Sequence, residues 1–295
     1  MIDVRYHIYS LAAVFLALAV GIVIGTSFAK SMPSDSTGRR TIQRYERVMR
    51  DLRGEIVKSS SKSVEEEAAL KSCQDYCRAM MPFVVKNKLY WRNVAVIQTG
   101  DNDDLTGSVK QALQMAGAEV SCTADINGTF DFTDDAAISQ ALTTAGIATS
   151  GNPSMDRQKM FGVLSTVLCS GKASYLVPKI EKAGIARITG DCSKVCKMVV
   201  FVGGSSSESK SLAQTVDAQV ITSLQKIGVT AVGCEPSNAA FSYVPLWHKT
   251  GIASIDNADT AMGQTCLVYA LNGESASFGT KKTADRLIPK TMESL

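Results

Sequence analysis

An uncharged apolar run near the amino terminus constrains this chain more than any other feature. The run Ile8–Ala29 holds 22 residues without a charge. At about 1.5 Å of rise per residue, a helix of this length crosses a hydrocarbon core of about 30 Å. No later segment of the 295 residues matches it. We therefore expect residues 1–30 to form a transmembrane anchor, and a single helix leaves a monomer without a lumen to act as a channel.

Two other readings of the run stay open. A cleaved signal peptide usually has an apolar region of about 7–15 residues and a more basic amino end than MIDVRYH, although Ser27-Phe28-Ala29 offers small residues for cleavage. A buried core helix rarely runs this long without a polar residue on one face. The length and uniform hydrophobicity favour a retained, single-pass anchor.

Charge and cysteine content bear on the side of the membrane and on the partners. The chain has 31 basic and 28 acidic residues, and the excess is local, with six arginines against two acids between Arg39 and Arg53. Basic residues flank the anchor mainly on its carboxyl side, which predicts a cytoplasmic carboxy-terminal region. Eight cysteines without an evident disulfide framework agree with a reducing compartment. We expect these arginines to contact anionic lipid rather than nucleic acid, since no base-reading motif accompanies them; they are Arg39, Arg40, Arg44 and Arg47.

A heptad pattern follows a polar linker at residues 31–41. Apolar residues recur at alternating steps of three and four, as at the a and d positions of a coiled coil; they are Ile42, Tyr45, Met49, Leu52 and Ile56, with Leu70, Cys73, Cys77 and Met80 in the same register. The middle of the seam, SSSKSVEEE, is polar. The pattern predicts a coiled-coil stalk over residues 42–81, ended by Pro82, that pairs two chains as a parallel homodimer.

Two thiols lie on one face of this stalk. Cys73 and Cys77 occupy d and a positions, so a parallel pair of chains would gather four thiols. Such a cluster would form an interchain disulfide or bind Cu(I) or Zn(II), since thiolates favour these ions. The alternative, and the commoner role of cysteine, is that both are small buried packing residues. Cys73 and Cys77 are thus the candidate metal ligands, with Cu(I) the candidate ion.

Residues 90–290 read as an α/β domain, with a possible division into two subdomains near 150–195. Short apolar runs alternate with amphipathic segments, which indicates a three-layer, Rossmann-like domain with a mostly parallel sheet. We expect strands at 94–99, 118–123, 198–202, 230–234 and 252–255, and helices at 104–116, 133–145, 154–170, 210–227 and 260–271.

Two loops lie where such a sheet usually binds ligands, beyond the carboxyl ends of strands. Gly203, Gly204 and Ser205 open a Gly-Ser loop whose backbone N–H groups could hold an anion at the start of the following helix. The loop matches neither a dinucleotide fingerprint nor a P-loop, and most Gly-Ser loops are turns. The acidic loop 99–104 would repel a phosphate.

Catalytic constellations are missing from the sequence. Its two histidines are His7, beside the anchor, and His248, which nearly excludes a histidine-built zinc site or a serine triad. Cys192 and Cys196 repeat the spacing of the stalk thiols, and we expect them in an exposed or half-buried loop without assigned chemistry. We expect no enzymatic activity and no resident cofactor.

The two ends of the chain resemble a known family. The opening Arg5–Gly21 and the late segments Ser254–Asn257, Gly263-Gln264, Gly279–Lys281, Thr283-Ala284 and Leu287–Pro289 are similar to the mycobacterial copper transport protein MctB family. The resemblance covers anchor, stalk and α/β domain. It implies a role in copper tolerance or efflux and an envelope location facing away from the cytoplasm, opposite to the charge rule. It brings no ligand set.

Three functions follow, in order. The first is a non-enzymatic copper-efflux or copper-homeostasis protein of the envelope. The second is an anchored coiled-coil scaffold that binds envelope or cell-separation partners, which needs no chemistry. The third is a degenerate α/β enzyme, ranked last for want of an acid–base pair.

Overall fold

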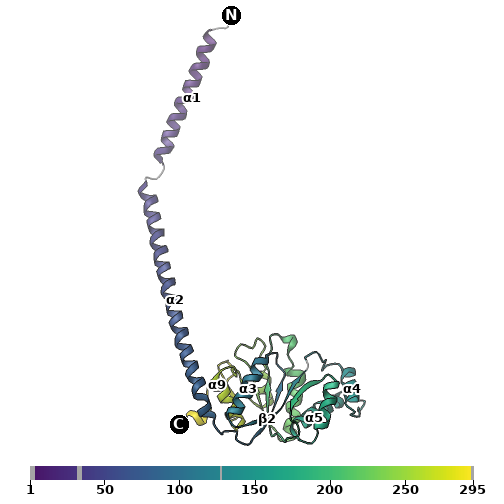
Figure 1. Cartoon of the computed structure of the whole chain (residues 1–295). Coiled ribbons are helices and arrows are strands. Elements are labelled where there is room, and N and C mark those ends of the chain that lie inside the picture. Colours follow the sequence, from purple (N-terminus) through teal and green to yellow (C-terminus); the bar gives the residue numbers. More distant parts are fainter. Residues whose placement is uncertain (1–3, 32–34, 127, 294–295) are drawn as a thin grey trace. The chain divides into compact units, whose positions relative to one another are not determined.

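The chain divides into two compact units, Met1–Lys71 and Ser72–Leu295. A computed structural model describes residues 4–31, 35–126 and 128–293 (Figure 1). We call the second unit the head. The region 150–195, where a subdomain boundary was considered, contributes helices and a strand to this same unit.

The first helix, α1, runs from Val4 to Ser31 and contains the uncharged run. Its large apolar side chains are exposed, with Phe15 at 64% and Leu16 at 68%. In the part of the chain that the structure describes, His7–Lys30 is the one helix long and apolar enough to cross a membrane, judged by length and composition. Apolar surface on this scale is unfavourable in water, so lipid or a partner must cover it.

The second helix, α2, runs from Asp35 to Val85. It starts inside the predicted linker 31–41, of which residues 32–34 lie outside the described part. The prediction that Pro82 ends the helix is wrong, because α2 passes through Pro82 for one more turn. Proline removes one helical hydrogen bond, but Met81 and Val85 on either side are buried in the head and stabilise the last turn by packing.

The apolar heptad side chains of α2 that the structure describes in its first unit are largely exposed. Met49, Leu52, Ile56 and Leu70 are between 47% and 66% exposed. The side chains of Ile42 and Tyr45 lie outside the described residues. The coiled coil therefore stays a prediction, and the exposed seam is the observation that favours it.

The head is built on a seven-stranded sheet of order β3-β2-β1-β4-β5-β6-β7. All neighbours are parallel except the edge strand β3, which runs antiparallel to β2. The strands are β1 Asn93–Gln98, β2 Glu119–Ile126, β3 Ala186–Gly190, β4 Met198–Val202, β5 Thr230–Cys234, β6 Ala253–Ile255 and β7 Ser277–Phe278. The predicted α/β class and mostly parallel sheet are confirmed, whereas the Rossmann-like layering stays a prediction.

The sheet is buried on both faces. Strand β1 shows the alternation, since Ala95 and Ile97 join one apolar cluster while Val94 and Val96 join the other. The end of α2 packs in the second cluster with α3 and α9, and the first cluster holds α4, α5, α7 and α8. Figure 1 shows α3 and α9 beside the end of α2, with α4 and α5 on the far side of the head. The helices are α3 Asp103–Met115, α4 Asp135–Thr144, α5 Pro153–Cys169, α6 Val177–Lys182, α7 Ala218–Lys226, α8 Val244–Thr250, α9 Ala261–Leu271 and α10 Lys290–Glu293.

The segment predicted as one helix over 210–227 is irregular at its start. A 3₁₀ turn at Glu208–Lys210 and a π-helical stretch at Ala213–Asp217 precede α7. The π-helical stretch ends at Asp217, whose buried side chain accepts a hydrogen bond from Trp247 Nε1 at 2.9 Å. Three more helices, α6, α8 and α10, and the strands β3 and β7 were not expected from the pattern.

Candidate functional site

The carboxyl edge of the sheet has a topological switch point between β1 and β4. The chain leaves β1 toward β2 and leaves β4 toward β5, on opposite sides. The two loops are tied together at their base, because Thr99 N and Gly100 N both donate to Val202 O at 2.9 Å. In open α/β sheets this is the usual ligand position. A cavity of about 450 Å³ lies here, lined by residues that include Asp101, Ser206 and Lys210.

Asp101 is the acceptor at the centre of this crevice. Its carboxylate accepts from Ser206 N at 3.1 Å and from Ser206 Oγ at 2.5 Å, and Lys210 Nζ lies 3.5 Å away. Burial acts to raise the pKa of Asp101, but the Ser206 hydrogen bonds and the charge of Lys210 outweigh it and hold the pKa below its ordinary value. The crevice therefore has its own anion.

The predicted anion loop lies in the same crevice. Gly203 N donates to Cys234 O at 2.9 Å and Ser205 N donates to Phe241 O at 3.1 Å. Gly204 has φ +81°, which favours glycine. The loop leads into a single 3₁₀ turn rather than a helix. A bound anion at Gly203, Gly204 and Ser205 stays a prediction, and it would have to compete with the carboxylate of Asp101 for the Ser206 N–H.

The neighbouring acids hold the end of the chain against the sheet. Glu235 is fully buried and accepts from Lys281 Nζ and Ser242 Oγ at 2.6 Å each and from Tyr243 N at 2.7 Å. Asp256 accepts from Thr280 N at 2.9 Å and Lys281 N at 2.7 Å. These carboxylates have partners for their charge and position the segment Gly279–Lys281, so their role here is structural.

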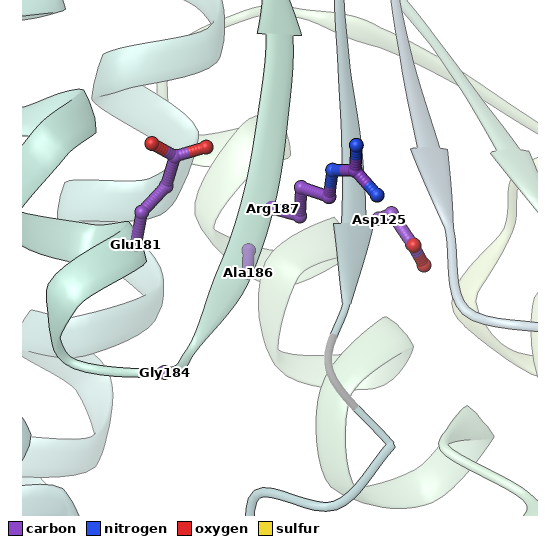
Figure 2. Close-up of a pocket in the computed structure, with 5 residues that line it drawn as sticks. All are labelled: Asp125, Glu181, Gly184, Ala186 and Arg187. Carbon is purple, nitrogen blue, oxygen red and sulfur yellow. The ribbon is translucent and has the colours of Figure 1, made fainter.

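A second cavity, of about 390 Å³, lies beside the antiparallel edge strand β3. Figure 2 shows Glu181 rising from its helix on one side of the strand while Arg187 extends toward Asp125 of the neighbouring strand. Glu181 Oε1 accepts from Ile188 N at 3.1 Å, which satisfies a donor on the open edge of the sheet. Burial and the charge of Asp103 raise the pKa of Asp125, against the lowering effect of Arg187. Because acidic and basic side chains both line this cavity, it has no preference for an anion or a cation. We interpret its side chains as covering the open edge of the sheet.

The predicted metal ligands Cys73 and Cys77 lie on α2 and are both exposed. The two thiols are within hydrogen-bond reach of one another. Loss of hydration, and then the charge and hydrogen bond of Cys73, raise the pKa of the Cys77 thiol. Sequence reasoning favoured a packing role for these two cysteines, but neither side chain is buried against the residues that the structure describes. Two soft donors on one exposed helical face are accessible to a metal ion.

Cys192 and Cys196 are not the exposed or half-buried pair that the sequence predicted. Their exposed fractions are 4% and 1%, and they lie with Cys122 and Cys169 in one apolar cluster. The Cys122 thiol hydrogen-bonds to both, which raises its own pKa. The hydrogen bond with Cys122 lowers the pKa of Cys192. The hydrogen bonds of Cys196 with Cys122 and with Ser121 lower its pKa to about 7, although burial acts to raise it. Burial raises the pKa of Cys169 to about 12.

Sequence reasoning noted the spacing of Cys192 and Cys196 but missed their partners, which lie far away in the chain. Among the described residues, no group of three or more His, Cys, Asp or Glu is placed to hold a metal ion. His248 lies exposed on the last turn of α8. The part of the chain that the structure describes thus offers one exposed pair of thiols, one buried cluster of thiols, and a crevice in which Asp101 is paired with Lys210.

The known proteins that this chain resembles are described as copper transport proteins. The profile of the family described as "Copper transport outer membrane protein, MctB" matches residues 1–289. Copper transporter MctB of Mycobacterium bovis and of Mycobacterium tuberculosis are each 26% identical to this chain over 188 residues, which is 62% of the chain. The match spans 57% of the length of these relatives.

The family match runs from the apolar helix through the head as far as residue 289. It includes the late residues Asp256, Gly279 and Lys281, which the structure brings together at one edge of the sheet. The predicted resemblance is confirmed, and the chain belongs to the MctB family of copper transport outer membrane proteins.

Proposed function

We propose that this chain is a single-pass, membrane-anchored protein that handles copper at the cell envelope without catalysing a reaction, and that Cys73 and Cys77 bind Cu(I). The observation that carries the proposal is a pair of exposed, contacting thiols on α2 in a member of a copper transport family. Thiolates are soft ligands that select Cu(I). Residues four apart lie on one helical face, so both sulfurs are presented together.

Membrane anchoring is supported by α1 and by the basic residues that follow it. The helix exposes an apolar surface long enough to span a bilayer. Arg44 and Arg47 are exposed on α2, and anionic lipid head groups are the partners that such a juxtamembrane cluster fits. The side chains of Arg39 and Arg40, the other two arginines proposed for lipid contact, lie outside the described residues.

Pairing of two chains through α2 would complete the site. The exposed seam of Met49, Leu52, Ile56 and Leu70 has the spacing that a parallel coiled coil buries. Parallel pairing would place four thiols at the same level of the stalk. Sedimentation of the detergent-solubilised chain, compared with a Leu52→Asp/Ile56→Asp variant, tests it. We expect a dimer that the two charges dissociate, and a monomeric wild-type chain would contradict the proposal.

Sidedness decides which copper pool the protein meets. The family description supports a head outside the cytoplasm, whereas the basic residues after α1 favour the cytoplasm. We propose the location outside the cytoplasm. A reporter enzyme that is active only outside the cytoplasm, fused after Leu295, should be active, and activity of a cytoplasm-specific reporter instead would contradict this choice.

The copper proposal is tested by titration of the reduced full chain in detergent. A chromophoric Cu(I) chelator competes for the ion, and wild type is compared with Cys73→Ser/Cys77→Ser. We expect the double variant to lose the exposed site. Micromolar or weaker affinity in wild type, or no change on substitution, would overturn the assignment of these ligands.

A rescue variant makes the test specific to the thiol pair. Ser59 and Ser63 are exposed on α2, four apart and in the same heptad register as the two cysteines. Adding Ser59→Cys/Ser63→Cys to the double serine variant should restore the site if two thiols on this helical face suffice. Ser59→Ala/Ser63→Ala in the wild-type chain is the matched control and should leave copper binding unchanged.

An anchored scaffold is the second candidate, and the exposed α2 seam is the observation that favours it. A scaffold without copper chemistry would keep its dimer and its envelope location when Cys73 and Cys77 are replaced, and cells would show no change in copper tolerance. Loss of copper tolerance in the Cys73→Ser/Cys77→Ser strain, with the dimer intact, distinguishes the two. A degenerate enzyme remains the least supported function.

A further inference from the structure

Four cysteines from three distant segments of the chain meet in the head. Cys122 lies in β2, Cys169 ends α5, and Cys192 and Cys196 lie in the connection from β3 to β4. Backbone pairing fixes their approach. Cys122 is opposite Gly190 in the antiparallel ladder, and Cys196 N donates to Cys169 O at 3.0 Å. The fold therefore brings the backbones of these segments together and places the four cysteines in one buried cluster.

Cys122 is the shared member of the group. Its sulfur is in hydrogen-bond contact with the sulfurs of both Cys192 and Cys196, and it lies 3.7 Å from Leu168 O. All four side chains are at most 4% exposed. Neither Cys234 nor Cys266, the other buried cysteines, takes part: Cys266 Sγ instead lies 3.5 Å from Leu287 O.

The cluster is close to the surface although it is buried. Along 191–197, Cys192 and Cys196 point inward, while Ser193, Val195 and the residues at 191 and 197 are exposed. Ser193 N and Oγ both donate to Asp191 Oδ1, which forms a local turn in this segment. A local opening of this segment would expose the thiols to an incoming ion, and it would have to break the contacts of Val195 with Ser170 and Asn93 and of Lys194 with Glu119.

The chemistry of the group selects a soft ion of low coordination number. The cluster presents mainly sulfur, with the Ser121 hydroxyl beside Cys196 and the Leu168 carbonyl beside Cys122, and thiolates select Cu(I) over hard cations. No group of three or more His, Cys, Asp or Glu in the described residues is placed to hold a metal ion, as a tetrahedral Zn(II) site would require. Cu(I) differs, because two thiolates in a linear arrangement satisfy it.

We propose that the head contains a second Cu(I) site, in which Cys122 is a constant ligand and Cys192 and Cys196 alternate as the second thiolate. This inference rests on the proposed copper-handling function but not on the stalk thiols. When Cu(I) binds, each of two thiols loses its proton to solvent and two Cu–S bonds form without any change of oxidation state. The two alternative partners let the ion shift between sulfurs without leaving Cys122.

The test uses the reduced full chain in detergent, without oxygen, with Cu(I) as the probe. Cys73→Ser/Cys77→Ser is the background, so that head binding is read alone. We expect this background to bind one Cu(I) per chain with the ultraviolet absorption of Cu(I)–thiolate bonds and two sulfur neighbours by X-ray absorption. Adding Cys122→Ser should weaken binding at least about tenfold, since it removes a ligand in every arrangement.

Matched variants separate ligand loss from loss of folding. Cys266→Ser in the same background is the control, because serine can still donate to Leu287 O, and it should bind Cu(I) normally. Cys192→Ser and Cys196→Ser should each keep the site, and the pair together should lose it. Circular dichroism and thermal unfolding confirm that each variant folds. Zn(II) in excess should not displace the ion.

The outcomes distinguish the two copper proposals. If the background binds no Cu(I) while wild type does, the head site is wrong and the stalk site stands. If wild type binds none, the proposed function fails and the head site with it. Equal binding by the Cys122→Ser and Cys266→Ser chains overturns the head site. So does recovery of Cys122 in a disulfide from the protein's own compartment.

Discussion

Two cysteine pairs with the same spacing lie in opposite environments of this molecule. Cys73 and Cys77 are exposed on one face of α2, whereas Cys192 and Cys196 are buried in a connection between strands. On the helix, a separation of four residues is itself sufficient to bring two thiols together. In the head, the same separation brings each thiol to a third one, Cys122, from another strand.

The comparison shows that the spacing of two cysteines predicts their contact only where the secondary structure is known. The helical pair is a local site that depends on α2 alone and on any second chain that joins it. The head cluster is a tertiary site that exists only when β2, β3 and the end of α5 are in place. Perturbations should therefore act on local thiol reactivity at the first pair and on folding at the second.

The largest expected difference comes from a buried charge. Cys122→Asp should destabilise the head by about 3–5 kcal/mol, because an unpaired carboxylate would replace a thiol that is 1% exposed. Cys73→Asp on the exposed helix should change stability by less than about 0.5 kcal/mol. Unfolding of the full chain, followed by fluorescence of the buried Trp247, measures both. Equal losses would remove the distinction between the two environments.

Thiol alkylation should show the next largest effect. In the reduced chain, Cys73 should react at least about 100-fold faster than Cys192, because the buried thiol must wait for a local opening that costs about 3 kcal/mol. Cys196 sharpens the test, since its pKa of about 7 would make it the faster thiol if it were accessible. Peptide mass spectrometry after timed quenching gives the rates. Labelling of Cys192 as fast as Cys73 would contradict the burial.

Sequence predicted most of the sheet because its strands carry local signals. The apolar runs at Met198–Val202 and Thr230–Cys234 were placed with their observed bounds, since short β-branched runs between turn residues rarely form anything else. The edge strand Ala186–Gly190 was missed because it mixes polar and apolar residues and is stabilised by Glu181 from a helix. The helix end was predicted wrongly at Pro82, because the packing of Met81 and Val85 offsets the hydrogen bond that proline removes.

The sites were harder to predict than the fold. The spacing of Cys73 and Cys77 was visible in the sequence because helical geometry is periodic. The head cluster needs Cys122, which is 70 residues from Cys192, and no periodicity relates them. The exposure of Cys192 and Cys196 was predicted wrongly for this reason, since burial there comes from strand pairing and not from the residues of the loop.

Ion pairs should give a smaller contrast of the same kind. Lys281→Met leaves the fully buried Glu235 without its cation and should cost about 2 kcal/mol, with Ser242 and Tyr243 N–H still donating. Lys62→Met breaks the exposed pair with Glu66 on α2 and should cost at most about 0.5 kcal/mol. Thermal unfolding of the full chain, followed by circular dichroism for α2 and by Trp247 fluorescence for the head, compares the two. A loss for Lys62→Met as large as that for Lys281→Met would contradict the prediction.

The smallest predicted effect concerns the pH dependence of stability that comes from Asp217, a carboxyl buried in the head. Burial raises the pKa of Asp217 to about 7 from 3.8, against the lowering effect of the Thr99 hydroxyl and of Trp247 Nε1–H. One of its oxygens, Oδ1, has no hydrogen-bond partner among the described residues. The folded chain therefore keeps a proton that the unfolded chain releases above its ordinary pKa.

The sign of the pH dependence follows from that proton. Between about pH 4 and pH 7 the folded state binds more protons at Asp217, so its contribution to stability falls as the pH rises. Asp217→Asn removes this dependence and keeps an acceptor for Trp247 Nε1, so its advantage over wild type should grow by more than about 1 kcal/mol from pH 5 to pH 8. Asp75→Asn on exposed α2, where Arg78 is the partner, is the control and should show no comparable growth. Chemical unfolding at both pH values measures the difference, and a constant advantage of Asp217→Asn would mean that Asp217 is ionised in the folded head throughout.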